Sequence, residues 1–187
     1  MSDSASRKRA ATLRQSQIRA KFPALRGLDE SLPRFVADVM LGRLAKWLRI
    51  AGFDVLYSNR FTDDEIVALS RQEGRILLSR DTRLLVRKTV KQFIFLESDK
   101  VQDQIRQIFN IIHTTDLPRL LTRCLSCNEL LNEVPRETVR EAVPPYVYAT
   151  QTLFKSCPKC RKIYWAGTHR QSVVRTLEAL ISRSLTG

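Results

Sequence analysis

Short apolar runs alternate with helical periods between residues 34 and 112. The apolar runs lack the polar alternation of a half-exposed strand, so they indicate strands buried on both faces. Between and after them, apolar residues recur every three to four positions, as on one face of an amphipathic helix. Strands that alternate with helices predict an α/β fold with a mostly parallel sheet flanked by helices. The predicted strands are Arg34–Ala37, Asp54–Tyr57, Arg75–Ser79 and Gln92–Leu96, and the predicted helices span about 41–51, 62–73, 81–88 and 101–112.

The alternation of strands and helices ends in the C-terminal part of the chain. Residues 122–168 contain several prolines and short β-like runs such as Tyr146–Tyr148. The apolar residues from Val173 to Ile181 then recur at helical spacing, which predicts a closing amphipathic helix. We therefore expect four parts, which are a tail over 1–33, an α/β domain over 34–121, a small module over 122–170 and a C-terminal helix over 171–187.

All four cysteines of the chain fall into two C-x-x-C pairs, Cys124/Cys127 and Cys157/Cys160, with 29 residues between the pairs. Four thiolates from two such pairs close a tetrahedral shell around one soft divalent ion, which favours structural zinc in a zinc ribbon. Disulfides are less favoured because no secretory signal is present, and a redox-active pair would explain only one of the two motifs. We expect zinc removal to unfold residues 122–168 and to spare the α/β domain.

The chain is strongly basic, with a formal net charge of +13 and a pI near 10.2. Such a surface attracts polyanions, nucleic acid first and anionic membrane second. Six Lys and Arg residues stand in the first 21 positions against one acid, Asp3, so residues 1–33 read as a basic tail. An organellar transit peptide is the alternative for this tail. Reduced cysteines without a signal peptide otherwise predict a cytoplasmic protein, and no run is long enough to span a membrane.

Acidic side chains follow three of the predicted strands. Asp38 follows the first strand, Asp81 follows the third, and Asp63 and Asp64 open the helix after the second. Parallel sheets bind ligands at the carboxyl ends of their strands, so these acids are expected to converge. Clustered carboxylates select Mg²⁺ or Mn²⁺, and such ions activate water over a phosphodiester. A basic protein with this acidic pocket is typical of a metal-dependent nuclease.

Each acid also has a purely structural interpretation. Thr62 and Glu65 form a capping-box pattern, so Asp63 and Asp64 can simply complement a helix N-terminus. Asp81 can be the N-cap of its own helix.

Basic residues near the predicted site are candidates for RNA contact. Three lie on the polar side of the first helix, one precedes Asp81, and two follow the second cysteine pair. A solvated helix face, or simple packing for the histidine, is the alternative. Tyr164 and Trp165 either offer a base-stacking surface or form the small core of the ribbon. The predicted RNA contacts are Arg43, Lys46, Arg49, Arg80, His169 and Arg170.

Several motifs taken together resemble one known family. They are Phe35–Arg49, Gly52–Asp54, Thr62–Ile66, Gly74–Asp81 and the Tyr164–His169 pattern after the cysteines. They are similar to the PIN-like ribonuclease domain found at the C-terminus of Mut-seven-type exonucleases and as stand-alone prokaryotic proteins, whose members carry a C-terminal zinc ribbon. The resemblance covers roughly residues 34–170.

The resemblance implies a PIN fold, a divalent-metal site and RNA as the substrate, with tRNA, rRNA or ribosome-associated RNA as candidates. It places Asp38, Asp63 and Asp81 at the family's acidic positions. A further acid of the PIN site is not placed, and Asp54 or Asp64 could supply it. Two other functions remain open on the sequence, a non-catalytic RNA- or ribosome-binding protein and a zinc-ribbon DNA-binding regulator, although the regulator leaves the acids unexplained.

Overall fold

The computed structural model describes residues 32–112 and 119–182. Four strands form one parallel sheet in the order β2-β1-β3-β4. In register, Val36 pairs with Leu56 on one side and with Leu77 on the other. The strands are β1 (Phe35–Ala37), β2 (Val55–Leu56), β3 (Ile76–Ser79) and β4 (Phe93–Phe95).

Helices cover both faces of this sheet. Phe35 and Leu78 point into a large core that also holds side chains of α2 and α5. Val36 and Leu77 point into a second core with side chains of α3 and α4. Both faces of each strand are therefore buried, which confirms the α/β fold expected from the apolar runs. The helices of this part are η2 (Val39–Leu41), α2 (Gly42–Ile50), α3 (Asp63–Gln72), α4 (Thr82–Leu85) and α5 (Val101–Ile112).

The cysteine-bearing module is a three-stranded antiparallel sheet, with β6 between β5 and β7. Val139, Val143 and Phe154 form its own small core. The connection from β5 to β6 contains two short helices. The elements are β5 (Asn132–Val134), η3 (Arg136–Val139), α6 (Pro145–Thr150), β6 (Phe154–Ser156) and β7 (Ile163–Trp165).

Tyr146–Tyr148 does not form the β-like run expected from the sequence, because it lies in α6. Pro145 occupies the first position of this helix, where a missing N–H costs nothing and the fixed φ suits helical backbone. The prolines therefore start a helical turn here instead of breaking a strand.

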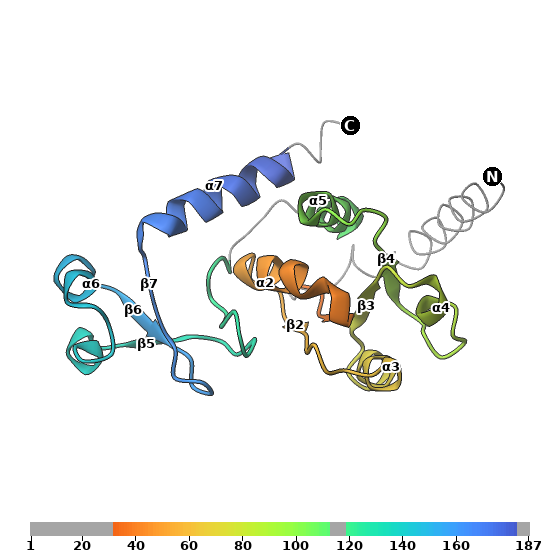
Figure 1. Ribbon diagram of the computed structural model, residues 1–187, viewed down its shortest axis with the longest axis horizontal. Coiled ribbons are helices and arrows are strands. Elements are labelled where there is room, and N and C mark those ends of the chain that lie inside the picture. Colours follow the sequence, from red (N-terminus) through yellow and green to blue (C-terminus); the bar gives the residue numbers. More distant parts are fainter. Residues whose placement is uncertain (1–31, 113–118, 183–187) are drawn as a thin grey trace.

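The closing helix α7 (Thr168–Ser182) returns to the α/β domain. Leu177, Leu180 and Ile181 are buried in the same core as Phe35, and α7 packs against α5. The chain thus leaves the α/β domain for the ribbon and comes back (Figure 1). Among the described residues, no helix is both long and apolar enough to cross a membrane. Residues 1–31, which make up most of the basic tail predicted over 1–33, lie outside the described part of the chain.

Candidate metal centre and active site

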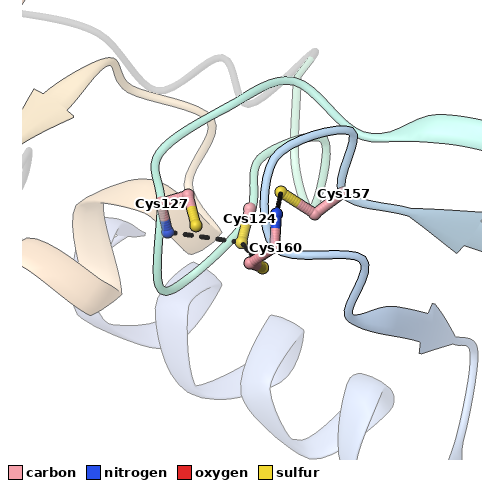
Figure 2. A group of neighbouring side chains, drawn as sticks. All are labelled: Cys124, Cys127, Cys157 and Cys160. Carbon is pink, nitrogen blue, oxygen red and sulfur yellow. Dashed lines mark hydrogen bonds between the residues drawn. The ribbon is translucent and has the colours of Figure 1, made fainter.

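The four cysteine sulfurs gather around one point between two loops (Figure 2). They all lie within 4.8 Å of one another, and the sulfurs of Cys124 and Cys160 are 3.6 Å apart. A tetrahedral zinc with Zn–S bonds of about 2.3 Å places its sulfurs roughly 3.8 Å apart. No described cysteine is in a disulfide. The cluster therefore fits one zinc ion, as the paired motifs predicted.

The two C-x-x-C loops share one backbone geometry. In the first, the Cys124 N–H donates to the Glu129 carbonyl, and the Asn128 N–H donates to the Cys124 carbonyl. In the second, Cys157 and Arg161 make the equivalent bonds. Asn128 and Arg161 both have positive φ, 70° and 60°. Asparagine tolerates this left-handed conformation better than most residues, whereas Arg161 adopts it at a cost that metal binding can offset.

Without a metal, the thiols of Cys124, Cys127 and Cys157 ionise unequally. Burial opposes ionisation of Cys124, but hydrogen bonds from the Tyr164 hydroxyl and the Cys127 N–H outweigh it and lower the pKa of Cys124 to about 6. The Cys160 sulfur and burial raise the pKa of Cys127 to about 12. Burial also raises the pKa of Cys157. Metal binding must therefore displace protons, so affinity for zinc is expected to rise with pH.

Arg49 joins the first cysteine loop to the α/β domain. Its guanidinium donates to the carbonyls of Leu125 and Ser126, at 2.8 and 3.1 Å, and also to the carbonyl of Val55. The side chain is only 3% exposed. This placement corrects its predicted role as an RNA contact, because no surface remains to reach a phosphate.

Asp54 supports the same junction from the start of β2. Its carboxylate accepts hydrogen bonds from Arg75 at 2.6 Å and from the Asn128 side chain at 2.7 Å. Burial opposes ionisation, but these bonds hold the pKa of Asp54 below its usual value. Asp54 precedes β2 whereas Asp38 follows the parallel strand β1, so Asp54 lies at the amino ends of the strands and Asp38 at their carboxyl ends. Asp54 is therefore not the missing acid of the predicted site.

The predicted catalytic acids follow strands of the parallel sheet, at the carboxyl ends of those strands. The strand order reverses between β1 and β3, and ligands of open α/β sheets bind at such a reversal point. Asp38 follows β1, and Asp81 follows β3 by two residues. Ser79 connects them, because its hydroxyl donates to the Asp38 carboxylate at 2.5 Å and accepts from the Asp81 N–H at 2.9 Å.

Asp38 is a buried acid without a cationic partner among the described residues. It is 4% exposed, and among the residues that the structure describes the Ser79 hydroxyl is the one group hydrogen-bonded to its carboxylate. The other buried charged side chains, Arg49 and Arg75, are satisfied by carbonyls or carboxylates. Buried charges are normally paired or coordinate a metal. The surroundings of Asp38 therefore suit a bound cation.

Asp63 and Asp64 are engaged elsewhere. Arg87 pairs with Asp64 at 2.5 Å and with Asp63 at 3.5 Å. Both acids lie in the first turn of α3, which also has the capping box of Thr62 and Glu65. Within the described residues, the cysteines are the one group of three or more potential ligands close enough to share an ion. The acids share an edge of the sheet but do not converge on one point.

Asp81 has the structural role that the sequence offered as an alternative. It is the N-cap of α4, with its carboxylate accepting from the Arg83 N–H at 2.8 Å. This backbone bond, with a smaller contribution from the Arg83 side chain, holds the pKa of Asp81 below its usual value. Capping engages mainly one carboxylate oxygen of Asp81, and the carboxylate stays partly exposed. Asp81 can therefore cap α4 and still bind an ion.

A cavity of about 620 Å³ is lined by the residues that follow Asp38 in the chain. Its wall begins with Val39 and Met40, directly after the acid, and includes Arg43 and Arg80 from the predicted RNA contacts. Lys100, at the start of α5, adds a third cation that the sequence pattern did not single out. The lining thus contains residues next in the chain to Asp38 and Asp81 and is mainly basic in its charged groups, with Asp99 as its one acid.

The family model of the Mut7-C RNAse domain matches residues 33–177, more than half of the chain. The chain belongs to the Mut7-C RNAse domain family. The matched range includes the parallel sheet, all four cysteines and most of α7, so sheet and ribbon belong to one family unit. Membership makes it a ribonuclease domain and implies RNA as the substrate. Comparison with curated proteins and with solved structures gave no match.

The remaining predicted contacts of this Mut7-C domain lie in two places. Lys46 is exposed on α2, and Arg170 is exposed near the start of α7. The side chain of His169 is outside the described part. Sequence reasoning did not single out Ser79, Arg87 or Asn128 as functional. The sequence does point to Ser79, because it stands two residues before Asp81 in a Ser-x-Asp motif. The partners of Arg87 and Asn128 are remote in sequence, so no local pattern indicates their roles.

Proposed function

We propose that this chain is a metal-dependent ribonuclease that hydrolyses RNA phosphodiester bonds at the carboxyl edge of its parallel sheet. The observation that carries the proposal is Asp38, an acid 4% exposed that is hydrogen-bonded to Ser79 and has no described cationic partner. The β1–β3 reversal point, where it sits, is the position at which such sheets bind ligands. The acids at these strand ends also support a PIN-like assignment of the α/β domain.

The donor set is suited to a hard divalent ion. Asp38 and Asp81, linked by Ser79, would hold Mg²⁺ or Mn²⁺, and Asp63 would join them once released from Arg87. Such an ion lowers the pKa of a bound water and stabilises charge on the scissile phosphate. Asp64, at 89% side-chain exposure, would act only in support.

The basic side chains of the cavity would position the RNA. Arg43, Arg80 and Lys100 line it, and phosphate oxygens are the groups that they bind best. Because these contacts are made to the backbone, they do not select a sequence. Candidate substrates are cytoplasmic tRNA, rRNA and ribosome-associated RNA.

Cleavage by the zinc-loaded full chain in added Mn²⁺ tests the proposal. We expect wild type to cleave unstructured RNA, and Asp38→Asn to lose more than about 100-fold in rate, beyond the loss typical of changing an outer-shell partner. The change keeps the shape of the side chain and removes the charge that would hold the ion. RNA binding should stay equal or become tighter, because a repulsive carboxylate is gone.

Glu178→Gln is the control. Glu178 is exposed on α7 and does not lie at the carboxyl ends of the strands. The variant removes one negative charge from the protein without touching the proposed site, so its cleavage rate should stay near that of wild type. Full cleavage by folded Asp38→Asn, free of contaminating nuclease, would remove the catalytic assignment.

A non-catalytic RNA- or ribosome-binding protein is the second candidate. It is favoured by Arg87, which pairs with both Asp63 and Asp64 and so occupies part of the predicted metal site. This function predicts RNA binding that is unchanged by Mn²⁺ and no cleavage by Arg87→Gln, a variant that frees both acids.

A further inference from the structure

The zinc ribbon carries an apolar groove that the proposed cleavage does not use. This ribbon groove has a volume of about 270 Å³ and lies between the ribbon sheet and the segment that enters it. Trp165 and Leu153 line it and are 39% and 71% exposed. Leu120, Leu121 and Leu131 complete an apolar lining. Exposed apolar surface gathered in one depression is typical of a binding site.

Trp165 is free to contact a ligand. The adjacent Tyr164 is committed to the metal centre, because its hydroxyl is 3.2 Å from the Cys124 sulfur and 3.2 Å from the Leu125 backbone nitrogen. In contrast, no described residue accepts a hydrogen bond from the Trp165 indole. The ribbon core is formed by Val139, Val143 and Phe154. Trp165 is therefore available as a flat, partly exposed ring beside the groove.

The rim of the ribbon groove is basic. Arg170 lines it, is exposed, and has no described acidic partner. Lys155 also lines it and lies 3.9 Å from Glu133, the one acid of the lining. Arg123 adds a third cation, although it is held by the carbonyls of Gly52 and Asn128. An aromatic surface with cations at its edge suits a nucleobase with its phosphate.

A basic face of α2 connects the active-site cavity with the ribbon groove. Arg43, Lys46 and Ile50 are spaced i, i+3 and i+7, so they lie on one side of the helix. Arg43 lines the active-site cavity, and Lys46 is exposed one turn later. At the far end, the Ile50 carbonyl accepts from the N–H of Leu121, which lines the ribbon groove. At about 1.5 Å rise per residue, Arg43 and Ile50 lie on the order of 10 Å apart along the helix axis.

We propose that the ribbon groove binds a base of single-stranded RNA, with its ring stacked on Trp165 and its backbone running along Arg43 and Lys46 to the acids. This assignment rests on the proposed function, since it names the class of RNA that the site takes. A base buried in a duplex cannot stack on a protein ring, so the groove selects single strands. A peptide or a second copy of the chain would occupy the groove without using the basic face of α2.

Binding of labelled RNA to the zinc-loaded full chain, without added Mg²⁺ or Mn²⁺, tests the groove separately from cleavage. We expect Trp165→Ala to weaken binding of a short single-stranded RNA about 10-fold, the loss typical of removing one stacking partner. Trp165→Phe keeps a ring and should bind nearly as wild type does. Binding of duplex RNA of the same length should not change with either variant.

Tyr146→Ala is the matched control, because Tyr146 is a ribbon aromatic with 76% exposure that does not line the groove. Its affinity for RNA should equal that of wild type, and zinc content should be equal in all variants. Equal single-stranded affinities of Trp165→Ala and wild type would overturn the proposal, as would equal losses for single-stranded and duplex RNA. A wild-type dimer that Trp165→Ala dissociates would assign the groove to a second copy instead.

The two assignments fail in different assays. If Asp38→Asn still cleaves RNA while Trp165→Ala binds single strands weakly, the catalytic site is wrong and the groove stands as an RNA-binding site. If Asp38→Asn is inactive while Trp165→Ala binds normally, the ribonuclease assignment stands and the groove is wrong.

Discussion

At the scale of single residues, Arg49 is one of the side chains that join the α/β domain to the first cysteine loop. All of its described hydrogen bonds go to backbone carbonyls, those of Val55, Leu125 and Ser126. A planar guanidinium can reach several carbonyls at once, whereas a lysine ammonium is a point charge and cannot span them. Burial lowers the pKa of Arg49, but an arginine remains charged at any physiological pH.

Arg49→Ala is therefore expected to destabilise the protein by about 2–4 kcal/mol. The substitution leaves buried carbonyls without donors and opens a void at the junction, and each unsatisfied buried group costs about 1–3 kcal/mol. Arg49→Lys should recover only part of this loss. Urea unfolding of the zinc-loaded variants measures the difference.

Lys46→Ala provides the control on the same helix, because Lys46 is exposed on α2. Its effect on the free energy of unfolding should stay within about 0.5 kcal/mol. If Arg49→Ala were equally mild, Arg49 would not hold the junction.

At the scale of elements, the first cysteine loop completes the edge of the parallel sheet. β2 is an edge strand, and its outer Val55 N–H donates to the Asn128 side chain at 2.9 Å while its carbonyl accepts from Arg49. Edge strands expose unpaired backbone groups that invite wrong pairing, and here loop and helix side chains cover them. Asp54 holds Asn128 in place from the start of the same strand.

Acid is expected to loosen this contact through Asp54. Its folded-state pKa lies below the unfolded value of about 3.9, so its contribution is complete above that pH and is lost as the pH falls through the folded-state value. Wild type should therefore be more stable than Asp54→Asn at pH 7, and the gap should narrow below about pH 4.

Urea unfolding of both proteins across this range measures the gap. The comparison is made at pH values where both proteins still hold zinc, because loss of the metal would also displace Asn128 from Asp54. A gap that stays constant down to low pH would show that Asp54 acts through shape alone.

The pattern of apolar residues predicted the sheet and its helices but not the contacts between the two parts. Strands of a parallel sheet are covered on both faces, so they appear in a sequence as continuous apolar runs. Four such runs between helical segments therefore predicted the sheet. Arg49, by contrast, reads as one more polar position on a helix, since periodicity shows which residues face away from the core and not what covers them. The helix α6 was not predicted, because Tyr146 and Val147 are residue types that favour strands. Their preference outweighed Pro145, which is typical of the first position of a helix.

The candidate site shows the same limit. Position after a strand predicted that Asp38 and Asp81 would share an edge of the sheet, and the Ser79 bridge agrees with that. The ion pairs of Arg87 with Asp63 and Asp64 join segments more than twenty residues apart, which no local pattern reveals. Tertiary partners decide whether an acid is free to bind an ion.

At the scale of the whole molecule, the ribbon and the α/β domain share their stability. The sequence alone predicts that zinc removal unfolds residues 122–168 and spares the rest. In the structure, the ribbon lies between α5 and α7 in the chain, and α7 contributes Leu177 and Ile181 to the main core. The first cysteine loop also supplies partners to Arg49 and Val55. Loss of the metal is therefore expected to reach the sheet.

The two tryptophans report on the two parts separately, because Trp47 lies in α2 and Trp165 in β7. In Trp165→Phe, the remaining Trp47 fluorescence follows the α/β domain alone. We expect a zinc chelator to shift the Trp47 unfolding transition to a lower urea concentration. Without the metal, the free thiols no longer hold the loop whose carbonyls accept hydrogen bonds from Arg49. Asn128, in the same loop, also loses its position against Asp54. Structural zinc contributes about 10–16 kcal/mol in small modules, ample to be shared across a contact of this size. The double variant Arg49→Ala/Trp165→Phe has already lost one part of the junction, whereas the contacts of Asn128 with Val55 and Asp54 remain. Chelation should therefore shift its Trp47 transition less than that of Trp165→Phe. A Trp47 transition that is identical with and without zinc would mean that the ribbon unfolds as an independent module.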